Sequence, residues 1–176
     1  TFTAPPTTPK IYHFAGQKIY DNDPLYRKYS DRNDPPRTLI AIPCFDMVHT
    51  EFMKSMLGLD KEDNTSFSVV QNTLIYNARN LIANNAVTYG FDRVLWFDSD
   101  MKFEPDVLHK LSAYMDKGYD FVSGVYYQRI DGGKPVIYSD LWYNVTENEA
   151  SAGSKNYEDF PEGLFEIAGS GFGCVM

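Results

Sequence analysis

The chain has 176 residues, of which 43% are hydrophobic and 15% aromatic, and its formal net charge is −8. Its length and composition indicate one globular domain with a sizeable core and exclude a disordered chain. The acidic charge and the lack of a Lys/Arg cluster argue against a nucleic-acid-binding surface. The sequence shows no apolar run long enough for a transmembrane segment and no signal peptide, so we expect a cytoplasmic protein.

Residues 1–36 differ in composition from the rest of the chain. They begin with the Pro/Thr-rich run TFTAPPTTP and continue with DNDPLYRKYSDRNDPPR, which is polar and rich in turn-forming residues. Such a sequence favours an extended arm or linker with little regular structure. We therefore expect this arm to precede a folded domain over residues 37–176.

Short apolar runs mark the expected strands. TLIAIP (38–43) and RVLWF (93–97) are almost wholly apolar, as in parallel strands that are buried on both faces. SFSVV (66–70) and DFVSGVYY (120–127) are two further strand candidates. Residues 134–145 alternate less cleanly, which indicates an antiparallel excursion.

Three helices are expected between the strands, each followed by a glycine that ends it. They cover residues 49–57, 74–89 and 105–117, and Pro105 is the expected first residue of the last helix. In the second helix, apolar residues recur at helical spacing and predict one buried stripe.

The alternation of strands and helices predicts an α/β fold with a mostly parallel central sheet flanked by helices and an antiparallel excursion near the C-terminus. Residues 151–163 are expected to form a loop, and residues 164–176 a terminal strand region. The residues expected in the core are Leu39, Ile40, Ile42, Leu81, Ile82, Val94, Leu95, Phe97, Leu108, Leu111, Phe121 and Val122.

Asp98 and Asp100 come directly after the apolar run RVLWF. Residues two apart point the same way in extended backbone, so both carboxylates can lie on one side of the strand end. Two such carboxylates repel each other unless a proton or cation intervenes, and hard divalent cations bind through one or two carboxylates plus substrate phosphates. The simpler alternative is that Asp98 caps the following turn and Asp100 is solvated. Their position after a buried strand favours the metal.

In open α/β sheets ligands bind beyond the carboxyl ends of the strands, and three candidate clusters lie at such ends, namely Pro43–Asp46, Asp98–Asp100 and Ser123–Arg129. Phe45, in IPCFD (42–46), can stack on a base or seal the loop. Arg79 has a planar fork that suits a phosphate, or it is an exposed helix arginine paired with an acid. AGSGFG (168–173) allows close backbone approach to a ligand, although it does not match the GxGxxG fingerprint.

Together these segments resemble the nucleotide-sugar-dependent glycosyltransferases with the GT-A fold, in particular the inverting family 2 type. LIAIPCFD is similar to the first strand and its nucleotide-side loop. NARNLIANNAVTYGFDRVLWFDSDM is similar to the helix that leads into the DxD strand, and GSGFGCVM to the Gly-rich segment beside the donor sugar. The resemblance covers residues 38–176.

The resemblance implies a role for each matching position. It implies a hexosyltransferase whose donor is a nucleoside-diphosphate sugar, with a UDP-sugar favoured, held by Mn²⁺ or Mg²⁺; the acceptor is not specified. Asp98 would contact the ribose or the metal, and Asp100 would bind the metal. The implied nucleotide-side residues are Pro43, Cys44, Phe45, Asp46 and Arg79, and those on the donor-sugar side are Gly169, Ser170 and Gly171.

The sequence departs from the family pattern at two places. Gln71 and Asn72 stand where the family often has an aspartate after the second strand. The chain also stops at Met176, before the region in which inverting members place a catalytic carboxylate. We therefore expect a fragment, or a chain that needs another segment, and the catalytic residue is not assigned.

Three other functions are compatible with parts of the pattern. Haloacid dehalogenase phosphatases also place DxD after an apolar strand, but they require Thr or Val where this chain has Lys102. Sugar nucleotidyltransferases begin with a Gly-rich phosphate loop, which IPCFDMVH lacks. A non-catalytic nucleotide- or sugar-binding module is the strongest alternative, because the expected base is missing.

Overall fold

A computed structural model of the chain describes residues 34–128, 130–145, 150–171 and 173–176. The chain divides into two units, Thr1–Pro35 and Pro36–Met176, of which the second is described below. The arm predicted over residues 1–36 lies almost wholly outside the described residues and stays a prediction.

The central sheet is built around the first predicted strand. This strand, β1 (Thr38–Pro43), pairs in parallel with β2 (Thr65–Val70) on one side and with β3 (Arg93–Phe97) on the other. A two-residue strand, β7 (Cys174–Val175), runs antiparallel to β3 and completes the order β2-β1-β3-β7. The carboxyl ends of the three parallel strands therefore meet at one edge of the sheet.

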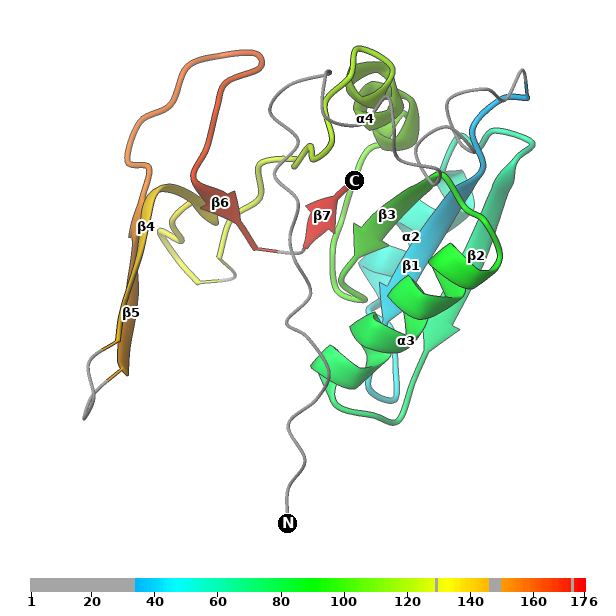
Figure 1. Cartoon of the computed structure of the whole chain (residues 1–176), viewed down its shortest axis with the longest axis horizontal. Coiled ribbons are helices and arrows are strands. Elements are labelled where there is room, and N and C mark those ends of the chain that lie inside the picture. Colours follow the sequence, from blue (N-terminus) through cyan, green and yellow to red (C-terminus); the bar gives the residue numbers. More distant parts are fainter. Residues whose placement is uncertain (1–33, 129, 146–149, 172) are drawn as a thin grey trace. The chain divides into compact units, whose positions relative to one another are not determined.

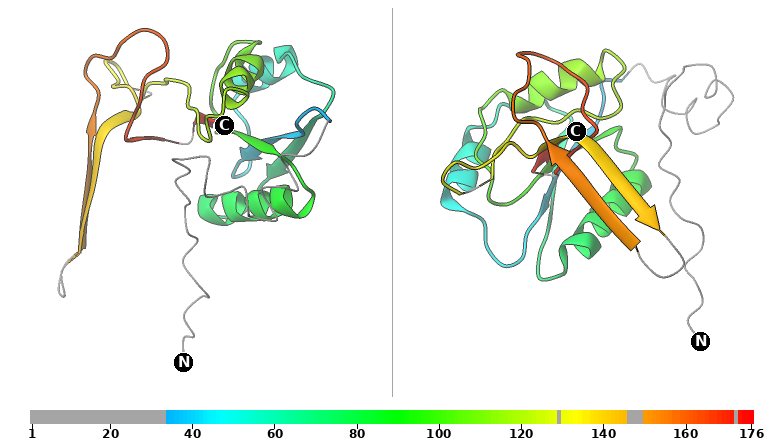
Figure 2. Two further views of the ribbon diagram at one scale, coloured as in Figure 1. Left: turned by 45° about the horizontal axis from the view of Figure 1, so that its top comes forward. Right: turned by 90° about the vertical axis from the view of Figure 1, so that its left-hand side faces the viewer.

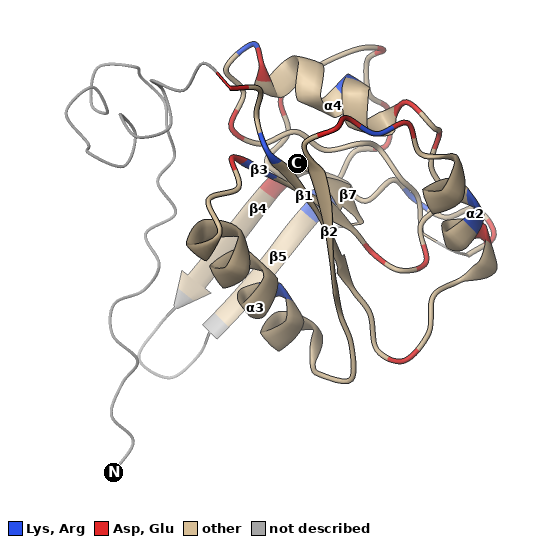
Figure 3. Cartoon of the chain, turned by 90° about the vertical axis from the view of Figure 1, so that its right-hand side faces the viewer, with Lys and Arg blue, Asp and Glu red and all other residues tan. Residues whose placement is uncertain are grey.

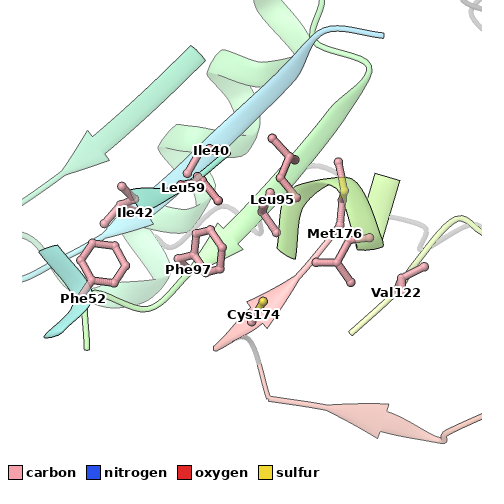
Figure 4. Close-up of a cluster of buried hydrophobic side chains, with 11 residues drawn as sticks. Ile40, Ile42, Phe52, Leu59, Leu95, Phe97, Val122, Cys174 and Met176 are labelled. Atoms are coloured by element: carbon pink, nitrogen blue, oxygen red, sulfur yellow. The ribbon is translucent and has the colours of Figure 1, made fainter. Parts of the chain in front are cut away.

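Helices cover both faces of this sheet (Figure 1). Side chains of α2 (Thr50–Gly58) and α4 (Val107–Met115) pack with Ile40 and Leu95 in the core cluster of one face, drawn in Figure 4. On the other face, Ile82 of α3 (Ile75–Thr88) packs with Leu39. Burial on both faces explains why β1 and β3 are almost wholly apolar. The predicted fold class is confirmed.

Each helix ends at, or shortly before, the glycine predicted to end it. Gly90 and Gly118 have φ angles of 67° and 91°, in the left-handed region that a residue with a side chain rarely adopts. The start predicted for the last helix is wrong by two residues. Helix α4 begins at Val107, and Asp106 rather than Pro105 is the residue next to it. No helix among the described residues has the length and apolar character needed to cross a membrane.

A second, antiparallel sheet follows α4 in sequence. It contains β4 (Ile137–Val145), β5 (Ala150–Asn156) and β6 (Gly169–Ser170), in the order β5-β4-β6. Strands β4 and β5 form the long two-stranded ribbon seen in Figure 2. The antiparallel excursion is confirmed. The loop predicted over residues 151–163 is wrong in its first half, because a small and polar sequence pairs with β4 as a strand.

Residues 120–127, predicted as a strand, form an extended segment without a continuous ladder. Within it, Val122 exchanges two backbone hydrogen bonds of 2.8 Å with Met176, and the Gly124 N–H donates to the Cys174 carbonyl over 3.0 Å. Ser123 and Tyr127 make isolated antiparallel bridges. The segment thus lies beside β7 and runs antiparallel to it.

Two residues predicted in the core are half exposed, and a third is only partly buried. Phe121 points away from the core because its neighbour Val122 points into it. Leu81 lies off the buried line of α3, which passes through Ala78, Ile82 and Ala86. Val94 is half buried against the α3 side of the sheet. The other nine predicted core residues are buried.

Cys44 and Cys174 are both buried, and each is a free thiol in the structure. Burial raises the pKa of the Cys174 thiol to about 12, from an ordinary value of 9.0. Above pH 9 the unfolded chain therefore loses this proton while the folded chain keeps it, and stability falls as the pH rises. We expect Cys174 alone to lower the free energy of unfolding by about 1.4 kcal/mol between pH 8 and pH 10.

Urea denaturation of the wild type and of Cys174→Ala at both pH values measures this contribution. The alanine variant retains every other titrating group, so its stability should fall less over the same interval. Identical pH dependences in the two proteins would contradict a strongly raised pKa at Cys174.

Candidate active site at the carboxyl ends of β1 and β3

A cavity of about 340 Å³ opens where β1 and β3 end and α3 begins. Its walls come from three separate parts of the sequence, namely the β1 end, the start of α3 and the β3 end. The lining residues are Pro43, Cys44, Phe45, Thr73, Leu74, Ile75, Ala78, Arg79, Asp98, Ser99 and Asp100. Six of the residues predicted for the site are among them, at the sheet edge where ligands of α/β proteins bind.

Backbone hydrogen bonds hold the loops around the cavity in place. The Cys44 N–H donates to the Val70 carbonyl over 2.9 Å, and the Asn72 N–H donates to the Phe45 carbonyl over 2.6 Å. Asn72 has a positive φ of 59°, a conformation that asparagine tolerates better than most residues. This turn links the ends of β1 and β2 and leaves the Phe45 ring exposed at the cavity wall.

The loop that carries the two aspartates is tied to the core on both sides. The Asp98 N–H donates to the Gly173 carbonyl over 3.1 Å, and the Ser99 carbonyl accepts from the His49 N–H over 2.9 Å. Beyond Asp100, the Phe103 ring stacks on Phe97 with 4.0 Å between ring centroids. Packing of Phe103 thus fixes the chain immediately after the aspartates.

Arg79 and Asp98 form an ion pair inside the cavity. The Arg79 Nη2 atom lies 2.9 Å from Asp98 Oδ1, and the side chains are 29% and 36% exposed. Both alternatives raised by the sequence are therefore partly met, because Arg79 pairs with an acid and that acid lies at the candidate site. A guanidinium beside two carboxylates leaves a cluster with one net negative charge, which can receive a cation and an anionic group together.

Asp100 is the more exposed of the two aspartates. Within the described part of the chain, no three His, Cys, Asp or Glu side chains gather as a complete metal site. Two carboxylates on one cavity wall nevertheless fit a hard divalent cation that takes its remaining ligands from water and from substrate phosphates. The donor set therefore suits Mg²⁺ or Mn²⁺ held jointly with a ligand.

The Gly-rich segment is placed differently from the rest of the predicted site. Gly169, Ser170 and Gly171 do not line the cavity. A Cβ atom on Gly171 would overlap the Tyr126 hydroxyl, and the Ser170 hydroxyl lies 2.7 Å from that of Ser123. Gly171 thus allows close packing against Tyr126, and the role of these three residues beside a donor sugar stays a prediction. Asp46 is exposed and also lies outside the cavity lining.

Tyr126 lies within the candidate cluster Ser123–Arg129, but no individual role was predicted for it. Its hydroxyl accepts a 3.0 Å hydrogen bond from the Gly173 N–H, and the Gly173 carbonyl in turn accepts from Asp98. Burial raises the pKa of Tyr126, and hydrogen bonds from Gly173 and Ser170 oppose this shift. A tyrosine in YYQ carries no sequence signal for such a contact, because its partner lies 47 residues away.

We expect Tyr126→Phe to lower the free energy of unfolding by about 1–2 kcal/mol, because a partly buried N–H loses its acceptor. Tyr157→Phe is the matched control, since the Tyr157 hydroxyl donates to the Glu166 carbonyl over 3.1 Å at an exposed position. Its loss should stay below about 0.5 kcal/mol. Chemical denaturation checks both values, and equal losses would show that the Gly173 contact contributes nothing special.

The sequence also did not predict that residues at the start of α3 line the cavity. Thr73, Leu74 and Ile75 form a large part of the cavity wall, and Leu74 and Ile75 are exposed there. The sequence assigned Leu74 and Ile75 only to the apolar stripe of the helix, and it assigned no role to Thr73. Exposed apolar residues in the first turn of a helix, next to the end of a strand, are the signal that could have identified them.

Comparison with known proteins places the chain in a family. Residues 62–172, more than half of the chain, match the family model described as Glycosyl transferase family 2. A search of curated proteins found no match. Among solved structures, the chain is similar to one described as the crystal structure of A197 from STIV, with a TM-score of 0.51 and 18% sequence identity.

The similarity to A197 covers 79% of this chain and 63% of that one, and at this identity it shows a shared fold alone. The family match includes α3, β3 with both aspartates, and the Gly-rich segment through Gly171. It thereby confirms the resemblance drawn from the DxD-containing segment: the chain belongs to glycosyl transferase family 2.

Proposed function

We propose that the chain transfers a hexose from a nucleoside-diphosphate sugar, bound in the cavity at the ends of β1 and β3, to an acceptor with inversion at the anomeric carbon. The observation that carries the proposal is the convergence of Asp98, Asp100 and Arg79 in one cavity beside an exposed aromatic ring. The family membership supports the reaction class and a nucleotide-sugar donor.

The cavity residues divide between the two parts of such a donor. Phe45, Leu74 and Ile75 offer apolar surface on which a nucleobase can stack, and a UDP-sugar is the donor we favour. Asp98 and Asp100 would hold Mn²⁺ or Mg²⁺ at the diphosphate. When bound, such an ion neutralises the charge that develops on the leaving diphosphate. Arg79 contacts Asp98 and adds a second positive charge on the same side.

A second candidate function is nucleotide-sugar binding without transfer. It is favoured by one observation: among the described residues lining the cavity, the acids are Asp98 and Asp100 alone. The proposal above assigns both of them to the metal at the diphosphate. An inverting transferase also needs a base for the acceptor hydroxyl. Binding experiments and turnover experiments therefore answer different questions.

Calorimetric titration of the full chain with UDP, GDP, ADP and dTDP, with Mn²⁺ or with EDTA, tests the site. We expect one nucleoside diphosphate to bind with a clear preference and only in the presence of the metal. Release of that nucleotide from its hexose conjugates then tests turnover. Metal-dependent binding without release would support the binding module, and no metal-dependent binding would contradict both functions.

A further inference from the structure

The β4–β5 ribbon carries an exposed tryptophan that the cavity does not explain. Trp142 lies in the middle of β4 and is 51% exposed. It is one of two tryptophans in the chain, and the other, Trp96, is partly buried in the central sheet. Tryptophan is enriched at binding surfaces because its ring combines a large apolar face with a hydrogen-bonding N–H group.

The backbone of β5 determines how the indole ring lies. Trp142 stands directly opposite Gly153 in the antiparallel register. A Cβ atom on Gly153 would overlap the indole ring, so the ring lies against the bare backbone of the neighbouring strand. Glycine at this position thus supports one face of the indole and leaves the other side of the ring toward solvent.

Polar residues surround the ring on the same face of the ribbon. Residues directly opposite one another, and residues two apart on a strand, share a face. The register pairs Asp140 with Lys155 on one side of Trp142, and Asn144 with Ser151 on the other. All four are exposed, and Figure 3 shows the acidic band of β4 beside the basic band of β5. We call these four residues, together with Trp142 and Gly153, the Trp142 face.

We propose that the Trp142 face binds a sugar unit of an oligosaccharide. A pyranose ring presents a flat patch of C–H groups, which packs on an aromatic face, and a rim of hydroxyls that donate and accept hydrogen bonds. A single ring flanked by a carboxylate, an ammonium, an amide and a hydroxyl matches both features. A lipid surface or an apolar protein partner would require a wider continuous apolar patch than one indole ring.

The ribbon is joined to the candidate active site through β6. Ile137, the first residue of β4, pairs with Ser170 of β6. Three residues further along the chain, Gly173 accepts a hydrogen bond from the Asp98 N–H. The same short segment therefore anchors the start of the ribbon and the aspartate loop. The binding of a glycan stands on the Trp142 face alone, whereas its assignment as the acceptor rests on the proposed glycosyltransferase function.

The test uses the full chain and four probes, namely maltohexaose, cellohexaose, chitohexaose and mannohexaose, in calorimetric titrations and ligand-observed NMR. We expect one probe to bind, and Trp142→Ala to weaken its binding at least about tenfold, because the stacking surface is lost. Trp142→Phe keeps an aromatic face and should recover most of the affinity. Gly153→Ala keeps Trp142 but displaces its ring, and should also weaken binding.

Tyr143→Ala is the matched control. Tyr143 is 75% exposed on the same strand but points to the opposite face of the ribbon, so its loss should change probe affinity less than about twofold. UDP binding with Mn²⁺, measured on the same samples, should be unchanged in all of these variants. If the wild type did not bind UDP with Mn²⁺, the proposed donor site would be contradicted, whereas the glycan proposal would not be affected.

Three results would overturn the glycan proposal. The first is that none of the four probes binds, and the second is that Trp142→Ala and Tyr143→Ala have equal effects. The third is that Trp142 instead governs binding to vesicles of phosphatidylcholine and phosphatidylglycerol, or self-association measured by light scattering. A membrane surface or a second copy of the chain would then be the partner of this face.

Discussion

We expect Asp100→Asn to slow sugar transfer about 100-fold or more and to weaken Mn²⁺-dependent binding of the nucleoside diphosphate more than tenfold. The substitution removes a charged ligand for the cation while keeping the size and shape of the side chain. Loss of this metal ligand weakens nucleotide binding and also reduces stabilisation of the leaving diphosphate in the transition state. The transfer rate should therefore fall more than the affinity. Calorimetry with and without EDTA and a nucleotide-release assay measure the two effects.

The fold should not suffer from this change. Asp100 is exposed, and its removal relieves repulsion between two nearby carboxylates, so the free energy of unfolding should stay equal or rise slightly. Asp106→Asn is the matched control. Asp106 lies six residues further on, and its carboxylate pairs with Lys110 at 2.8 Å outside the cavity. Equal, metal-independent nucleotide binding by wild type and Asp100→Asn would leave the aspartates as an ordinary turn.

The parts of the fold that were predictable are those in which local pattern and tertiary position agree. A strand covered on both faces is apolar along most of its length, and β1 and β3 show this in the sequence. The ends of α3 and α4 were equally clear, since Gly90 and Gly118 meet a backbone requirement that few other residues meet.

The remaining strands depend on partners far away in the sequence. Strand β5 consists of small and polar residues and exists because β4 pairs with it, while β6 and β7 are two residues long. A central sheet that ends in β7 rather than in residues 120–127 cannot be read from either segment alone. The hydrogen bonds of Val122 with Met176 and of Gly124 with Cys174 place residues 120–127 beside β7, whereas β7 itself pairs with β3.

The candidate site divides in the same way. Residues directly after buried strands were predictable, because parallel strands bring their carboxyl ends to one edge, and Pro43, Phe45, Asp98 and Asp100 share one cavity. Tyr126 was not, because its contact with Gly173 depends on the path of the chain between them. A Gly-rich run likewise indicates close approach, but not whether a ligand or a tyrosine ring is the neighbour.

Because Arg79 forms an ion pair with Asp98, we expect its removal to change nucleotide affinity and metal affinity in opposite directions. In Arg79→Ala, we expect the nucleoside diphosphate to bind about 10- to 100-fold more weakly, because a charged hydrogen-bonding partner contributes roughly 1.5–3 kcal/mol. Binding of Mn²⁺ alone should become several-fold tighter in the same variant. The guanidinium that contacts Asp98 Oδ1 at 2.9 Å repels a second cation and competes with it for that oxygen.

Arg93→Ala provides the control from the same strand. Arg93 begins β3 and forms an ion pair with Asp116, whereas Asp98 directly follows the end of β3, so the two pairs stand at opposite ends of one element. Its loss should leave both affinities within about twofold of wild type, since it lies outside the cavity. Calorimetric titrations of Mn²⁺ alone, and of UDP at saturating Mn²⁺, give the two values for each protein.

If both affinities fell together in Arg79→Ala, Arg79 would serve to hold Asp98 in position for the metal. Opposite changes would show that the arginine and the cation share Asp98, and that the diphosphate is what allows both positive charges to occupy one cavity.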